Sequence, residues 1–236
     1  ATYRQTSRIT SELQEKDPRN LLLARGPRFR LQGEFIRDHA LAISGLMVGD
    51  IGGPSVKPYQ PPGLWNEVAL SANVKFVQDH GDNLYRRSMY IYWKRSAPQP
   101  AMLIFDAPTR EKCTIQRQRT NTPLQALALM NDVQFVEAAR ALAQRMMQEG
   151  GKTIESRLTF AHRLATAHRP SAKIIEILTD AYRTHLEAFK QDPSRADQLL
   201  QVGESKADPA LDNIEHAAWT MVANILLNLD QFVTRG

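Results

Sequence analysis

Apolar residues recur every three or four positions along most of the second half of this chain. That spacing is typical of one buried face of an α-helix, whereas a half-buried strand shows alternation every two residues. A helix start is also predicted at Thr122, a capping residue, because Pro123 follows at the first helical position. The clearest runs are Ile175, Leu178, Tyr182, Leu186 and Phe189, and Ile214, Ala218, Val222, Ile225 and Leu229. We therefore predict a mainly α fold, a single irregular helical domain over residues 1–236 with long Gly/Pro-rich loops and little or no sheet.

Two further helices are predicted in the first half of the chain. In residues 31–47, Ile36 and Ile43 share one face with other apolar residues at helical spacing, and Arg37 falls on the other side. Residues 84–95 also suit a helix.

Residues 49–63 lie between these segments, and eight of the fifteen are glycine or proline. No helix survives that density of helix-breaking residues. A connection of this length inside a compact domain is often functional. The alternative is a surface crossover packed by Val56, Tyr59, Leu64 and Trp65, and the sequence leaves both interpretations open.

Positive charge is concentrated in residues 86–131, which we call the basic segment. It contains eight Lys or Arg residues against two acids, Asp106 and Glu111, so it carries +6 while the whole chain carries +5. The remaining residues therefore sum to −1. Charge gathered in this way indicates an anionic partner, although it specifies no reaction.

Standard catalytic and cofactor motifs are missing from the sequence. The single cysteine, Cys113, excludes an internal disulfide, a CxxC zinc site and CxxCH haem attachment within the chain. The six histidines lack HExxH or HxH spacing, and neither a glycine-rich phosphate motif nor GxSxG occurs. We therefore expect no metal and no cofactor in this chain.

Two classes of partner are disfavoured. No apolar run reaches the roughly 18 residues of a membrane span. Nucleic acid is a weak interpretation, because basic residues interleave with Tyr85, Tyr90, Tyr92 and Trp93 but no recognition motif accompanies them.

Asp106 follows Phe105 and precedes Ala107-Pro108, where a turn can hold its side chain rigidly. Because arginines surround it in sequence, we expect a structural salt bridge or a hydrogen-bond anchor rather than a general acid. The alternative is an Asp–Arg pair that binds a hydroxylated or anionic ligand.

Several blocks of the sequence resemble one known family over nearly the whole chain, from Thr2 to Val233. They are ATYRQTSR, LLLARGPRFRLQGEFIRD, IGGPSVKPYQPPGLW, NLYRRSMYIYWKR, FDAPTREKCTIQRQRTNTPLQALALMND and AAWTMVANILLNLDQ. The chain is similar to a planctomycete-type C-terminal domain of unknown function, found in large exported proteins with cytochrome c-like domains. One departure is Gln231, where the family usually has Glu.

The resemblance implies several expectations and no activity. It implies an extracytoplasmic location (periplasmic or secreted), upstream domains of the same polypeptide as partners, and haem in an upstream domain rather than here. It also implies that the domain begins before Ala1, so that residues 1–236 are truncated on the N-terminal side.

The sequence leaves three functional hypotheses open. In the first, the chain is a non-catalytic binding or scaffold module whose arginines hold an anionic, sulfated or uronic, polysaccharide through paired hydrogen bonds, while aromatic rings stack on sugars. The candidate ligand-binding residues are Tyr59, Trp65, Arg86, Arg87, Trp93, Asp106, Arg110, Arg117, Arg119 and Asn121.

In the second hypothesis, Asp106, Arg110 and Cys113 form half of an enzyme active site that an upstream domain completes. In the third, the domain is purely structural and its arginines form buried pairs with internal acids. The expected acids are Glu34, Asp38, Glu137 and Asp230.

Overall fold

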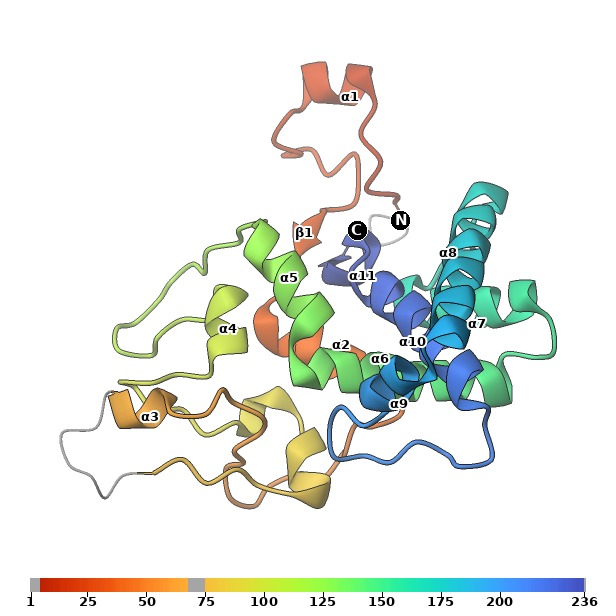
Figure 1. The fold of residues 1–236 in the computed structure, drawn as a ribbon. Coiled ribbons are helices and arrows are strands. Elements are labelled where there is room, and N and C mark those ends of the chain that lie inside the picture. Colours follow the sequence, from red (N-terminus) through yellow and green to blue (C-terminus); the bar gives the residue numbers. More distant parts are fainter. Residues whose placement is uncertain (1–4, 68–74, 236) are drawn as a thin grey trace.

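The computed structural model describes residues 5–67 and 75–235, and helices dominate it (Figure 1). Within these residues the only sheet is the antiparallel pair β1 (Phe29–Arg30) and β2 (Thr234–Arg235). The mainly α class is confirmed. The helices are α1 (Ser11–Lys16), α2 (Gly33–Ser44), α3 (Leu64–Glu67), η2 (Gly81–Tyr85), η3 (Ser88–Tyr90), α4 (Pro100–Ile104), α5 (Pro123–Asn131), α6 (Val133–Glu149), α7 (Ile154–Thr166), α8 (Ala172–Gln191), α9 (Pro193–Leu200), α10 (Asn213–Leu227) and α11 (Asp230–Val233), where η marks a 3₁₀ helix.

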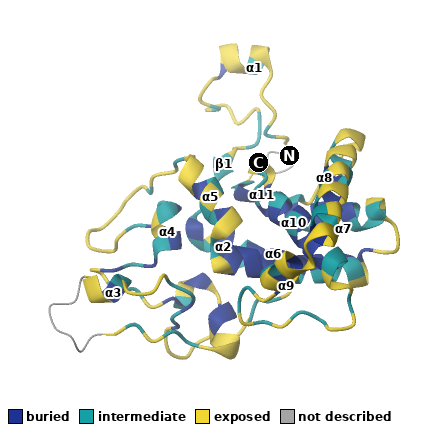
Figure 2. Ribbon diagram, in the orientation of Figure 1, coloured by how far each residue is buried: buried dark blue, intermediate teal, exposed yellow. Residues whose placement is uncertain are grey.

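The core is centred on α6 and α10, which pack against each other and contribute ten buried residues each, more than any other helix that the structure describes (Figure 2). Trp219 of α10 is fully buried and stacks on Tyr182 of α8, with ring centroids 4.1 Å apart. From α2, Ile36 and Ile43 add to the same cluster, as predicted. Removing this apolar surface from water is the main force that stabilises the fold.

Side chains cap most of the helices in the second half of the chain. Asp132 accepts a hydrogen bond from Gln134 N at 2.9 Å, and Asp212 accepts one from Glu215 N at 2.7 Å. Each bond satisfies a backbone donor that the first turn leaves free. Thr122 precedes α5 as predicted, but its hydroxyl makes no capping bond.

Arg37 lies on the buried side of α2, so its predicted place on the opposite side is wrong. Its guanidinium is 1% exposed and donates to the carbonyls of Leu84 (2.7 Å) and Arg86 (2.8 Å). It also donates to Ser88 Oγ (3.1 Å) and Gln134 Oε1 (2.7 Å). Burial lowers the pKa of Arg37 to about 10. Four acceptors compensate for burying the charge, so Arg37 joins α2 and α6 to the irregular region.

Residues 84–95 form no α-helix, so that prediction is also wrong. They contain the end of η2, then η3, then extended backbone. Their peptide groups bond elsewhere, because Tyr90 O accepts from Val56 N at 2.8 Å and Tyr92 N donates to Val56 O at 2.7 Å. The Gly/Pro-rich residues 49–63 supply Val56 and form no helix, as predicted.

No helix in the described ranges is both long and apolar enough to cross a membrane.

Candidate functional site

Arg86 holds the Gly/Pro-rich loop in place. It is 6% exposed, and its guanidinium donates to the carbonyls of Pro54 (2.9 Å), Asp50 (3.4 Å) and Gly52. The same group stacks on the ring of Tyr90, whose hydroxyl accepts from Gly52 N at 2.8 Å. The guanidinium of Arg86, a predicted ligand-binding group, therefore already donates to the backbone of its own loop.

A second buried polar cluster surrounds Glu137 of α6, which is fully buried. Its carboxylate accepts from the Tyr85 hydroxyl at 2.8 Å and from Ser205 N at 2.6 Å, and Arg140 lies 3.8 Å away. Burial, together with the bond to Glu137, raises the pKa of Tyr85 to about 12. The loop after α9 approaches so closely that a Cβ at Gly203 would overlap this carboxylate. The cluster fixes that loop on α6.

Two arginines of the basic segment are engaged on the surface. Arg117 donates to Glu34 Oε2 at 2.8 Å and to Gln32 Oε1 at 2.9 Å. Arg110 stacks on Trp93, with its guanidinium carbon 4.5 Å from the ring centroid. The basic segment therefore pairs with Glu34 as expected, although this pair is only partly buried.

The other three acids expected to pair also contact arginines, but these come from outside the basic segment. Asp38 lies 3.7 Å from Arg37, Glu137 faces Arg140, and Asp230 pairs with Arg28.

The remaining candidates are scattered. Trp65 is only 7% exposed and is covered by Lys94, whose Nζ lies 4.2 Å from the ring centroid. Tyr59 packs against a small apolar cluster, and its hydroxyl accepts from Glu204 N at 2.7 Å. Arg87 and Asn121 are exposed. The structure does not gather these four around one site.

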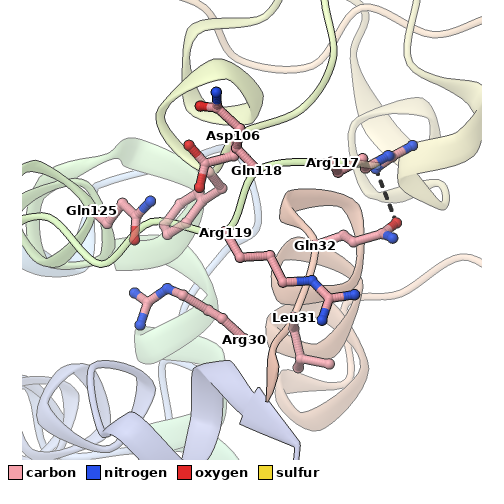
Figure 3. A pocket seen from close by; sticks show the side chains of 9 residues that line it. Arg30, Leu31, Gln32, Asp106, Arg117, Gln118, Arg119 and Gln125 are labelled. Atoms are coloured by element: carbon pink, nitrogen blue, oxygen red, sulfur yellow. Dashed lines mark hydrogen bonds between the residues drawn. The ribbon is translucent and has the colours of Figure 1, made fainter. Parts of the chain in front are cut away.

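A small pocket does bring together four polar side chains from distant segments (Figure 3). Arg30 enters from β1, Asp106 follows α4, Arg119 precedes α5, and Gln125 belongs to α5. The cavity measures about 10 Å³. It is completed by Leu31, Gln32, Phe105, Arg117 and Gln118.

Pairing of β1 with β2 positions Arg30 in this pocket. Arg30 lies opposite Thr234, and Leu31 N donates to Val233 O at 2.8 Å. Burial lowers the pKa of the Arg30 guanidinium, while Asp230 and Asp106 raise it. No hydrogen bond or ion pair engages the Arg30 side chain within the part of the chain that the structure describes.

Asp106 serves as an anchor, one of the two roles that the sequence favoured. Its backbone is left-handed, with φ 61°. Its carboxylate accepts from Thr120 N at 2.7 Å and from Thr120 Oγ1 at 2.8 Å and 3.0 Å. These bonds fix the chain that carries Arg119, and no salt bridge within 4 Å joins Asp106 to an arginine among the described residues.

An open hollow of about 700 Å³ adjoins the pocket and shares Gln32, Arg117, Gln118 and Arg119 with it. Thr114, Ile115 and Gln116 form the rest of its lining. Arg119 is exposed here and lies over the ring of Phe29, 4.8 Å from its centroid. Small-molecule sites commonly enclose 300–1,000 Å³, so a sugar-sized group has room.

Sequence reasoning missed Arg30 and Gln125. Arg30 lies outside the basic segment, and Gln125 is a neutral residue near a helix start. One sequence signal could have indicated them, because both residues lie in the blocks that resemble the known family.

Nowhere in residues 5–67 and 75–235 do three or more His, Cys, Asp or Glu side chains gather as metal ligands. Cys113 and Arg110 are both exposed, and the enzyme half-site built on them with Asp106 stays a prediction.

Comparison with known proteins gives one match. The family model PSD1, described as "Protein of unknown function (DUF1553)", matches residues 1–182. Neither a curated protein nor a solved structure matches the chain.

Proposed function

We propose that this chain, which belongs to the DUF1553 family of proteins of unknown function, is a non-catalytic binding module for an anionic glycan. One observation carries the proposal. Arg30 and Arg119, 89 positions apart in sequence, line one pocket beside an open hollow, and neither pairs with a carboxylate among the described residues.

The charge arrangement favours an anion at this place over the rest of the basic segment. Arg86 and Arg117 already donate to acceptors of their own chain, whereas Arg119 is exposed beside the hollow. Guanidinium groups bind carboxylate and sulfate through two parallel N–H bonds.

The ligand we propose is a uronic or sulfated polysaccharide. Calorimetric titration with oligogalacturonate and with dextran sulfate tests this. Arg119→Gln should weaken binding about tenfold, since one charge-assisted contact contributes about 1.5 kcal/mol. Arg87→Gln removes the same charge from another exposed position and should change affinity less than about twofold. Absence of binding at millimolar ligand, or equal effects of the two variants, would overturn the proposal.

The proposal includes the setting of the module. We propose that residues 1–236 form one domain of a larger exported protein with a cytochrome c-like domain upstream, because the resemblance described above implies both. Cell fractionation and haem staining of the full-length protein test these points. A cytoplasmic, haem-free protein would contradict this part while leaving glycan binding open to its own test.

A purely structural domain is the second candidate, favoured by the internal bonds of Arg86 and Arg117. It predicts that neither Arg119→Gln nor Arg87→Gln changes the affinity measured in any binding assay.

A further inference from the structure

Two residues that line the small pocket each have a buried polar atom without a hydrogen-bond partner among the described residues. These atoms are the Nε of Arg30, a donor, and the Oε1 of Gln125, an acceptor. Gln125 is fully buried. Each such unsatisfied group costs about 1–3 kcal/mol, so an occupant that bonds to both atoms would stabilise the site.

The orientation of the Gln125 amide is fixed by its other end. Nε2 donates to Ile104 O at 2.9 Å and to Thr120 Oγ1 at 3.0 Å. Because a carbonyl only accepts, the amide nitrogen must face Ile104. Oε1 therefore points the opposite way, toward the guanidinium of Arg30 (Figure 3).

Few chemical groups satisfy both atoms in a cavity of about 10 Å³, which holds roughly one oxygen. A hydroxyl accepts from Arg30 Nε and donates to Gln125 Oε1. A carboxylate or sulfate oxygen only accepts, so it leaves Oε1 unpaired and also faces the carboxylate of Asp106. An ammonium group only donates, and it would meet the positive charge of Arg30.

We propose that this pocket takes a hydroxyl oxygen of the ligand while Arg119 holds its anionic group in the adjoining hollow. The ligand is then a hydroxylated carboxylate, of which a uronate is the example carried by polysaccharides. This inference rests on the proposed function and narrows it, because a glycan with its hydroxyls blocked loses the inner contact.

Titration with glucuronate and with per-O-methylated glucuronate tests the inference. Both compounds carry the carboxylate, but the methyl ethers cannot donate to Gln125 Oε1. The wild-type chain should bind glucuronate about tenfold more tightly, which corresponds to one hydrogen bond to a buried polar atom. Arg30→Lys keeps the positive charge and removes the Nε donor, so this ratio should fall to about one. Arg119→Gln should weaken both ligands and leave the ratio unchanged.

The outcomes separate the two claims. The wild-type protein could bind the two compounds equally while Arg119→Gln weakens the binding of both. That result would overturn the claim that the pocket binds a hydroxyl, and it would still support anion binding at Arg119. Binding of neither compound overturns both claims. Should Arg30→Lys fail to fold by circular dichroism, the wild-type comparison of the two ligands decides alone.

Discussion

The guanidinium carbon of Arg86 lies 4.1 Å from the ring centroid of Tyr90, and both side chains bond to the backbone of Gly52. The Gly/Pro-rich loop is therefore clamped between an arginine and a tyrosine that lie four positions apart. This relationship assigns the most buried arginine of the basic segment to the fold rather than to a ligand.

Arg86→Lys should destabilise the protein by about 2 kcal/mol. Lysine keeps the charge, but it has neither the planar fork that bonds to several carbonyls nor the flat surface that stacks on Tyr90. Buried carbonyls of the loop lose donors, each at a cost of about 1–3 kcal/mol. The free energy of unfolding in urea measures the effect.

Arg87→Lys is the matched control for that substitution. Arg87 is the next residue and is exposed, so its stability change should stay within about 0.5 kcal/mol. Equal destabilisation by both variants would show that the clamp contributes nothing.

Gly203→Ala should destabilise the protein more than Gly63→Ala. Both glycines have left-handed backbones, with φ of 88° and 83°, so alanine is strained at either position. At Gly63 nothing lies within 4 Å of the added Cβ, whereas at Gly203 the Cβ meets the Glu137 carboxylate. The difference in unfolding free energy between the two variants measures the cost of this overlap and should reach about 1–3 kcal/mol. Equal unfolding free energies for the two variants would mean that the loop moves away without cost.

The contribution of Tyr85 to stability should fall as the pH rises from about 10 to about 12. The pKa of Tyr85 is about 12 in the folded protein and about 10 in the unfolded chain. The folded state therefore keeps the proton over this window, and its contribution, fully present below pH 10, is lost as pH rises toward 12. Unfolding free energies measured at steps between pH 8 and 12 give the slope.

Tyr85→Phe should lower stability near pH 7 by about 1–2 kcal/mol, since Glu137 loses a buried donor. Its deficit relative to the wild type should shrink as the pH rises from about 10 to about 12. Tyr92 is 43% exposed, so Tyr92→Phe serves as the control and should leave the slope as in the wild type. A deficit of Tyr85→Phe that stays constant between pH 8 and 12 would show that Tyr85 contributes nothing to the pH dependence.

How much of this fold the sequence predicts depends on the range of each interaction. The helices of the second half follow from periodicity and caps, which act within a few residues. Arg37 was misplaced because one of its acceptors, Gln134, lies 97 positions away. An arginine in a predicted helix is expected to be exposed until its buried partners are known.

The candidate site was predictable only in part for the same reason. The basic segment contributes Asp106, Arg119 and Gln125, but Arg30 arrives through pairing with a strand at the C-terminal end. Conversely, charge alone could not separate Arg86, which bonds to its own loop, from Arg119, which is exposed. Once the arginines that bond to their own chain are set aside, the candidate ligand site narrows from the whole basic segment to one pocket and one hollow.

The most direct test is a crystal structure of the chain soaked with glucuronate. We predict a sugar hydroxyl about 3 Å from both Arg30 Nε and Gln125 Oε1, with the carboxylate against Arg119 in the hollow. A pocket that holds only water while glucuronate is bound at Arg87 or elsewhere, or at no position at all, would contradict this account.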